Sequence, residues 1–155
     1  MSELVDLYFL VKTRDQGKVL DFLNEFAPCR MEVAEDYPVP IYSNEPKCVY
    51  EKVLDLMKYL EKYTSEEYSI YWKNLNLDSN IKYLMAFYTD DSGLIFGVSI
   101  VGKNPMDSNI EIKYFTIKKF LSATIGCATI EEVPPFNMME FDDFCRNRYI
   151  PRANL

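Results

Sequence analysis

Two apolar runs joined by a short polar segment constrain the fold of this chain more than any other feature. Residues 82–89 and 94–101 are rich in β-branched and aromatic side chains, which favour extended strands. Residues 90–93 between them read Asp-Asp-Ser-Gly, a composition typical of a tight turn. The pattern predicts a β-hairpin, in which Gly93 serves the turn.

Other strands follow from apolar alternation. Residues 4–13 place Val5, Leu7, Phe9 and Val11 on one face while the other face is also partly apolar, so we expect a central strand. Strands are also expected over 68–74 and 125–133. A short strand is possible over 30–34, and 37–44, which contains two prolines, should be extended, irregular or a sheet edge.

Four segments have helical periodicity. The first should begin after Asp15 and end before Pro28. In the second, Asn44 and Pro46 resemble a cap and first turn. An apolar stripe follows, which comprises Val49, Val53, Leu56, Met57 and Leu60. The third helix begins with the capping-box pair Ser108 and Glu111, and the fourth covers 137–146.

This order of elements predicts one α+β domain over residues 1–155. We expect a mixed or mainly antiparallel sheet of about four to six strands, packed with two or three helices. No linker or low-complexity segment divides the chain.

Charge limits the classes of partner. The chain has 17 Lys and Arg against 24 Asp and Glu, which gives a net charge of -7. Nucleic-acid binding depends on clustered basic residues, so we expect no direct nucleic-acid binding. An acidic surface attracts a basic protein partner instead. The residues contain no apolar run long enough for a membrane span and no signal-peptide pattern, so we expect a cytoplasmic protein without a membrane partner.

Residue types that commonly carry catalysis are scarce. The chain has no histidine, which excludes Ser-His-Asp and Cys-His hydrolases. Its four cysteines form no C-x-x-C pair, so we expect free thiols and no zinc site, and the chain has no phosphate-binding loop. We therefore assign no catalytic, metal or cofactor residues. Sequential carboxylates, of which there are five pairs, diverge on a strand or helix and could form an acid–base dyad only across different elements.

Aromatic residues gather in the middle of the chain beside acidic ones. In the expected strand over 68–74, Tyr68 and Trp72 share one face and Tyr71 lies on the other, so one face would be core and the other a docking surface. Tyrosine and tryptophan are enriched at interface hot spots. The candidate partner-binding residues are Glu66, Glu67, Tyr71, Asp90 and Asp91.

Two stretches, YSIYWKN over 68–74 and AFYTDDSGLIFGVS over 86–99, resemble small acidic bacterial immunity proteins of polymorphic and contact-dependent toxin systems. The resemblance covers about the middle fifth of the chain. It implies a single-domain cytoplasmic binder that blocks a toxin, often a basic nuclease, by covering its active site or substrate groove.

Three hypotheses follow. The first is a non-catalytic protein that neutralises a cognate toxin by direct binding. The second is a small carboxylate- or metal-dependent enzyme whose acids converge from separate elements. The third is a regulatory or ligand-binding domain with an apolar pocket, for which residues 38–42 could form a rim.

Overall fold

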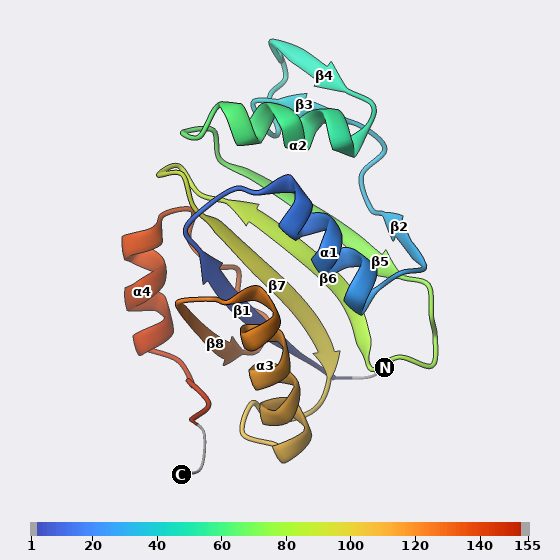
Figure 1. The fold of residues 1–155 in the computed structure, drawn as a ribbon. Coiled ribbons are helices and arrows are strands. Elements are labelled where there is room, and N and C mark those ends of the chain that lie inside the picture. The colour runs from blue at the N-terminus through green and yellow to red at the C-terminus, as the bar shows by residue number, and fades with distance from the viewer. Residues whose placement is uncertain (1–2, 153–155) are drawn as a thin grey trace.

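The computed structural model describes residues 3–152, which form one α+β domain around a six-stranded sheet (Figure 1). The strand order is β2-β5-β6-β7-β1-β8, and every neighbouring pair is antiparallel. The strands are β1 (Leu4–Val11), β2 (Arg30–Glu32), β5 (Tyr68–Asn74), β6 (Ile81–Tyr88), β7 (Leu94–Val101) and β8 (Ile125–Thr129). The expected fold class is therefore confirmed, and β1 lies inside the sheet between β7 and β8.

The predicted hairpin is formed by β6 and β7, whose register pairs Tyr88 with Leu94. The turn differs from the expectation in one respect. Ser92, rather than Gly93, takes the left-handed conformation, with φ 76°. A side-chain carbon on Gly93 would lie 2.6 Å from the Met138 side chain, so Gly93 permits close packing rather than the turn itself.

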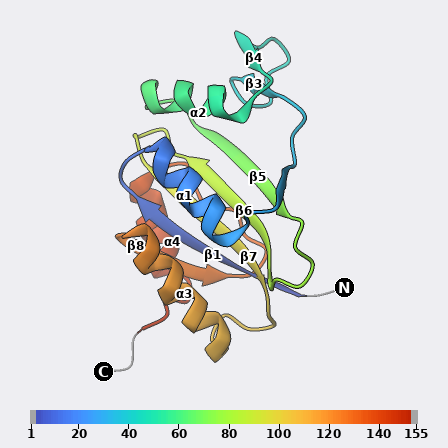
Figure 2. The ribbon, with the colours of Figure 1, turned by 45° about the vertical axis from the view of Figure 1, so that its right-hand side comes forward.

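Three helices cover one face of the sheet: α1 (Gln16–Phe26), α2 (Val53–Lys62) and α3 (Ser108–Leu121). Figures 1 and 2 show α1 and α3 side by side across this face, with α2 over the end of β5 and β6. Their apolar stripes pack with Leu7, Phe9, Ile70, Trp72 and Phe96 in the main core. The alternation expected for β5 is confirmed, because Tyr68, Ile70 and Trp72 are all buried on this face.

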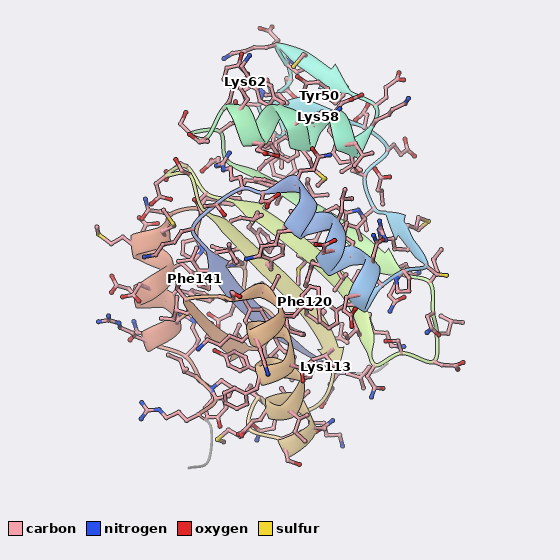
Figure 3. The ribbon with its side chains drawn as sticks, viewed as in Figure 1. Tyr50, Lys58, Lys62, Lys113, Phe120 and Phe141 are labelled. Atoms are coloured by element: carbon pink, nitrogen blue, oxygen red, sulfur yellow. The ribbon has the colours of Figure 1, made fainter. Side chains whose placement is uncertain are left out.

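A fourth helix, α4 (Met138–Arg146), packs on the opposite face. Phe141 points from α4 toward the sheet (Figure 3) and packs in a second cluster with Tyr8, Phe87 and Ile95. The predicted start of this helix is confirmed, because the Asn137 side chain accepts hydrogen bonds from the first-turn N–H groups. The C-terminal segment then returns to β8, where Ala128 bridges Tyr149.

The predicted start of the second helix is wrong. Residues 48–50 form β4 (Cys48–Tyr50), which pairs with β3 (Tyr37–Val39) in a small separate sheet, and α2 begins only after Lys52. Strand pairing with a segment about ten residues earlier overrides the local helical pattern there. Two further boundaries differ from the predicted ones. The residue before α3 is Asp107, so Ser108 is the first residue of the helix rather than its cap. The strand expected over 125–133 ends at Thr129, as β8.

Arg14 joins three elements at one end of the sheet. Its guanidinium is buried and donates to the carbonyl oxygens of Leu60 (2.9 Å) and Tyr63 (3.1 Å) at the end of α2, and to that of Thr89 after β6. The Tyr63 carbonyl also accepts from the Glu66 N–H at 3.2 Å. Arg14 therefore fixes α2 to the hairpin beside the candidate site.

Candidate protein-binding surface

The structure brings the four predicted carboxylates to the same end of the sheet. Glu66 and Glu67 immediately precede β5, while Asp90 and Asp91 follow β6. The two strands pair where they meet the acidic segments, since Tyr68 lies opposite Tyr88. The Ser92 N–H also donates to the Thr64 carbonyl at 3.0 Å, which holds the hairpin turn against the segment before β5.

Tyr71 lies apart from these carboxylates. It is three residues along β5 from Tyr68, a separation of about 10 Å in an extended strand. Its half-buried ring stands edge-on to Phe87, with ring centroids 5.7 Å apart. Burial raises the pKa of the Tyr71 phenol, and the neighbouring Tyr42 phenol raises it further. Tyr71 is therefore not part of the acidic group, and it lines a cavity together with Tyr42.

Asp90 and Asp91 are engaged within the molecule. The Asp91 carboxylate accepts from the Met138 N–H at 3.0 Å, and Asp90 accepts from the Asn137 side-chain amide at 3.2 Å. Both contacts are at the N-terminus of α4, where the helix dipole favours negative charge. These two aspartates fix α4 to the hairpin, which leaves them less free for a partner than the sequence suggested.

Glu66 and Glu67 differ in their freedom. The half-buried Glu66 carboxylate accepts from the Tyr59 hydroxyl at 3.2 Å. Glu67 is exposed and, within residues 3–152, its side chain has neither a hydrogen bond nor a salt bridge. Of the predicted acids, Glu67 is therefore the one most available to a cation on a partner.

The edge of β5 is only half covered. The edge strand β2 pairs with Trp72–Asn74, and its last bond runs from the Val33 N–H to the Tyr71 carbonyl at 3.0 Å. Backbone groups alternate direction along a strand, so the N–H and C=O of Ser69 point to the same side as those of Tyr71. No strand of residues 3–152 pairs there, which leaves a short free edge at residues 68–70.

A groove lies along this free edge. We call it the β5 groove, a largely apolar cavity of about 150 Å³ between β5 and the segment over residues 33–42. Tyr42 on its rim is 82% exposed and takes a left-handed conformation, with φ 61°. The expected rim over residues 38–42 contributes Pro38, Ile41 and Tyr42. The complete lining is Val33, Ala34, Asp36, Tyr37, Pro38, Ile41, Tyr42, Tyr68, Ser69, Ile70 and Tyr71.

Negative charge flanks the β5 groove. Asp36 lines the groove together with Tyr68, and Glu66 lies two residues before Tyr68. Burial raises the pKa of the Tyr68 phenol, and the Asp36 and Glu66 carboxylates raise it further. Asp36 and its neighbour Glu35 are exposed and form no salt bridge within residues 3–152. Asp36 was not among the predicted site residues, and Tyr42 was expected only as part of the rim over residues 38–42. Their proximity in sequence to the proline-interrupted aromatic segment was the available signal.

No family model, curated protein or solved structure matches this chain. The resemblance to immunity proteins therefore stays a prediction, and the surface has to be interpreted from its own chemistry. Among the helices of residues 3–152, none combines the length and apolar character needed to cross a membrane.

A different group of acids lies elsewhere on the sheet. Glu3, Asp6 and Glu131 line a cavity of about 500 Å³ beside the start of β1. Burial raises the pKa of the Asp6 carboxyl, although the Ser99 hydroxyl donates to it at 2.6 Å. None of these three was a predicted site residue. Within residues 3–152 no three His, Cys, Asp or Glu side chains are grouped so as to hold a metal ion.

Proposed function

We propose that this chain is a non-catalytic protein-binding module that binds a basic partner, as an immunity protein binds its toxin. The observation that carries the proposal is the β5 groove: an aromatic, apolar slot at a free sheet edge, flanked by exposed carboxylates that form no salt bridge with any of residues 3–152. Apolar and aromatic anchors supply most of the binding free energy at protein interfaces. Rim charges chiefly increase the association rate.

The test begins with the product of the neighbouring gene, the natural choice for a toxin partner. The two purified proteins should form a stable complex, and this chain should rescue cells that express the neighbouring product. Neither complex formation nor rescue would be observed if the proposed function is wrong.

Charge reversal then locates the surface. Glu67→Lys should slow association and reduce its dependence on salt, because Glu67 is exposed and has no internal partner. Glu25→Lys is the matched control, since Glu25 is also exposed but lies on α1 rather than in the segment before β5. Equal effects of the two variants would mean that net charge alone matters. Asp91 is unsuitable for this test because its carboxylate holds α4.

The carboxylate-dependent enzyme is the second candidate, and Asp6 is the observation that favours it. A carboxyl group with a raised pKa beside a second acid in a cavity is a common arrangement for general acid–base chemistry. Calorimetric titration with Mn²⁺ tests its metal-dependent form. Mn²⁺ binding that is lost in Asp6→Asn and kept in Asp21→Asn would support the metal-dependent form, and absence of Mn²⁺ binding to the wild type would refute that form.

A further inference from the structure

The β5 groove is too small for a whole small-molecule ligand. Its volume is about 150 Å³, whereas small-molecule sites usually measure about 300–1,000 Å³. Its largely apolar lining includes four tyrosines, Tyr37, Tyr42, Tyr68 and Tyr71. Aromatic rings attract one another by more than their burial alone provides. One aromatic side chain of a larger partner is therefore the occupant that fits this groove.

The backbone of Ser69 is the second feature of the groove. The Val33 N–H donates to the Tyr71 carbonyl, so the N–H and C=O of Ser69, two residues earlier in β5, point to the same edge. The chain then leaves this edge toward β3 (Figure 1), and no residue of 33–42 is hydrogen-bonded to the Ser69 backbone. Ser69 lines the groove and is only 8% exposed. Buried backbone groups are nearly always paired, so a partner strand would supply what Ser69 lacks.

The charge at the β5 groove has one sign. Asp36 lines the groove, and the lining contains no Lys or Arg. Glu67, two residues before Ser69, adds a second exposed carboxylate, and neither acid forms a salt bridge within residues 3–152. A second copy of this chain, with its net charge of -7, would bring like charges to the same edge. A basic segment is therefore the complementary occupant.

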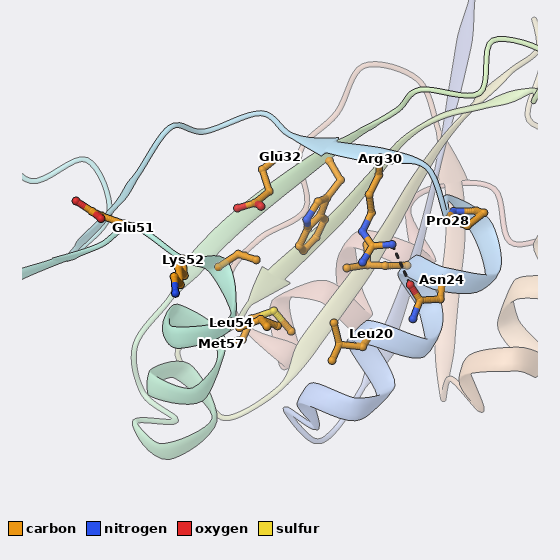
Figure 4. A pocket seen from close by; sticks show the side chains of 12 residues that line it. Leu20, Asn24, Pro28, Arg30, Glu32, Glu51, Lys52, Leu54 and Met57 are labelled. Carbon is orange, nitrogen blue, oxygen red and sulfur yellow. Dashed lines mark hydrogen bonds between the residues drawn. The ribbon is translucent and has the colours of Figure 1, made fainter.

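The larger cavity between α1, the start of α2 and β2 has a different character (Figure 4). It measures about 600 Å³, and its charged lining consists of two acids, Glu32 and Glu51, and two cations, Arg30 and Lys52. This balance selects neither an anion nor a cation. Charge of a single sign beside unpaired backbone groups is found at the β5 groove and not at this cavity.

We propose that the partner presents an extended basic segment that adds to the free edge of β5. One backbone unit of the segment pairs with Ser69, an aromatic side chain enters the groove, and flanking Lys or Arg side chains contact Asp36 and Glu67. The proposal rests on the proposed function and specifies how that partner is recognised. In strand addition, main-chain hydrogen bonds supply affinity, and pockets for alternate side chains supply specificity. The β5 groove offers both.

A peptide titration tests the segment without the natural partner. The probe is the peptide acetyl-KKTFTKK-amide, added to ¹⁵N-labelled protein. We expect a saturable shift of the Ser69 amide resonance and slower hydrogen exchange at that amide. Replacing the Phe of the peptide by Ala, or its four Lys by Glu, should weaken binding at least about five-fold. An unchanged Ser69 resonance, or equal binding of the three peptides, would overturn the proposal.

Backbone N-methylation of the probe tests the strand pairing itself. Two further peptides each carry one N-methyl group, one at the Phe and one at the Thr that follows it. Successive N–H groups of a strand point to opposite sides, so only one of the two methyl groups would face β5. The affinities of the two peptides should therefore differ at least about ten-fold. Equal affinities would refute the strand pairing.

A pair of aspartate variants tests the position of the charges. Asp36→Asn should weaken binding of the probe about two- to five-fold, as expected for one exposed charge. Asp78→Asn is the matched control, since Asp78 is exposed in the loop after β5 and does not line the groove. Equal affinities of the two variants would refute the contact assigned to Asp36.

The same Ser69 amide, measured in the complex with the neighbouring gene product, separates this proposal from the proposed function. Slower hydrogen exchange at Ser69 in that complex would support the added segment. A complex that leaves the Ser69 amide unchanged would overturn the segment alone, whereas absence of a complex would overturn the proposed function.

Discussion

Replacing Arg14 tests the claim that one buried guanidinium holds α2 to the hairpin. Arg14 is 5% exposed and donates to three backbone carbonyls. Its guanidinium carbon lies 5.3 Å from the centroid of the Tyr88 ring. Burial lowers the pKa of its guanidinium, which shows that the charged form is partly desolvated. Two large contributions to stability therefore oppose each other. The hydrogen bonds of the charged guanidinium stabilise the fold, and its desolvation destabilises the fold.

The expected magnitude follows from these contributions. Hydrogen bonds to a charged group stabilise by about 1.5–3 kcal/mol each, and desolvation of a buried ion offsets several kcal/mol of that sum. Arg14→Met removes all three bonds; the Leu60 and Thr89 carbonyls lose this donor, while the Tyr63 carbonyl still accepts from the Glu66 N–H. We expect it to lower the free energy of unfolding by roughly 2–4 kcal/mol, a large share of the 5–15 kcal/mol typical of a domain. Arg14→Lys keeps the charge but has one nitrogen, so it should recover only part of the loss.

The assay is urea denaturation followed by fluorescence of the buried Trp72, with the m-value checked for constancy. Lys12→Met is the matched control, because Lys12 is an exposed cation two residues earlier, and it should change stability by less than about 0.5 kcal/mol. A loss for Arg14→Met as small as that of the control would refute the reasoning. Complete recovery in Arg14→Lys would show that charge matters and the fork geometry does not.

Three further predictions concern single sites. Burial raises the folded-state pKa of Asp6, so the contribution of Asp6 to stability is present at low pH and is lost as pH rises through the folded pKa. The stability of Asp6→Asn relative to wild type should therefore increase from acid to neutral pH in thermal melts. A difference in stability that stays constant with pH would contradict this. Cys29 is exposed whereas Cys127 and Cys145 are fully buried, so a thiol reagent should label Cys29 rapidly and the buried pair only in denaturant, as mass spectrometry would show. A side-chain carbon on Gly126 would lie 2.6 Å from a backbone carbonyl of β1, so Gly126→Ala should cost about 1–3 kcal/mol in urea denaturation, and a neutral result would mean that β8 shifts freely.

The sequence predicted those elements whose signals are local. The hairpin of β6 and β7 follows from alternating apolar residues and a polar turn, and the α4 cap at Asn137 follows from a side chain within one turn of its donors. The buried face of β5 follows from the same two-residue period. These features need no knowledge of distant partners, so patterns in the chain were sufficient.

Where partners are distant in sequence, the local pattern failed or said nothing. The predicted start of the second helix, after Asn44, is replaced by β4, because residues 48–50 pair with β3, and the helix begins only at Val53. Likewise, Asp91 looked available to a partner, yet it accepts from an N–H group 47 residues later. A local propensity of a few tenths of a kcal/mol per residue is easily outweighed by such tertiary hydrogen bonds and burial.

The sequence by itself determined an acidic, aromatic α+β domain without histidine, in which the acids before β5 and after β6 would be close once those strands paired. Only the tertiary structure decided which acids remain free, which edge of β5 stays open, and that the segment over 33–42 forms a groove with that edge. The physical reason is that composition and periodicity fix which faces are buried. Cavities, free edges and unpaired donors are what remains after every element has found its partner.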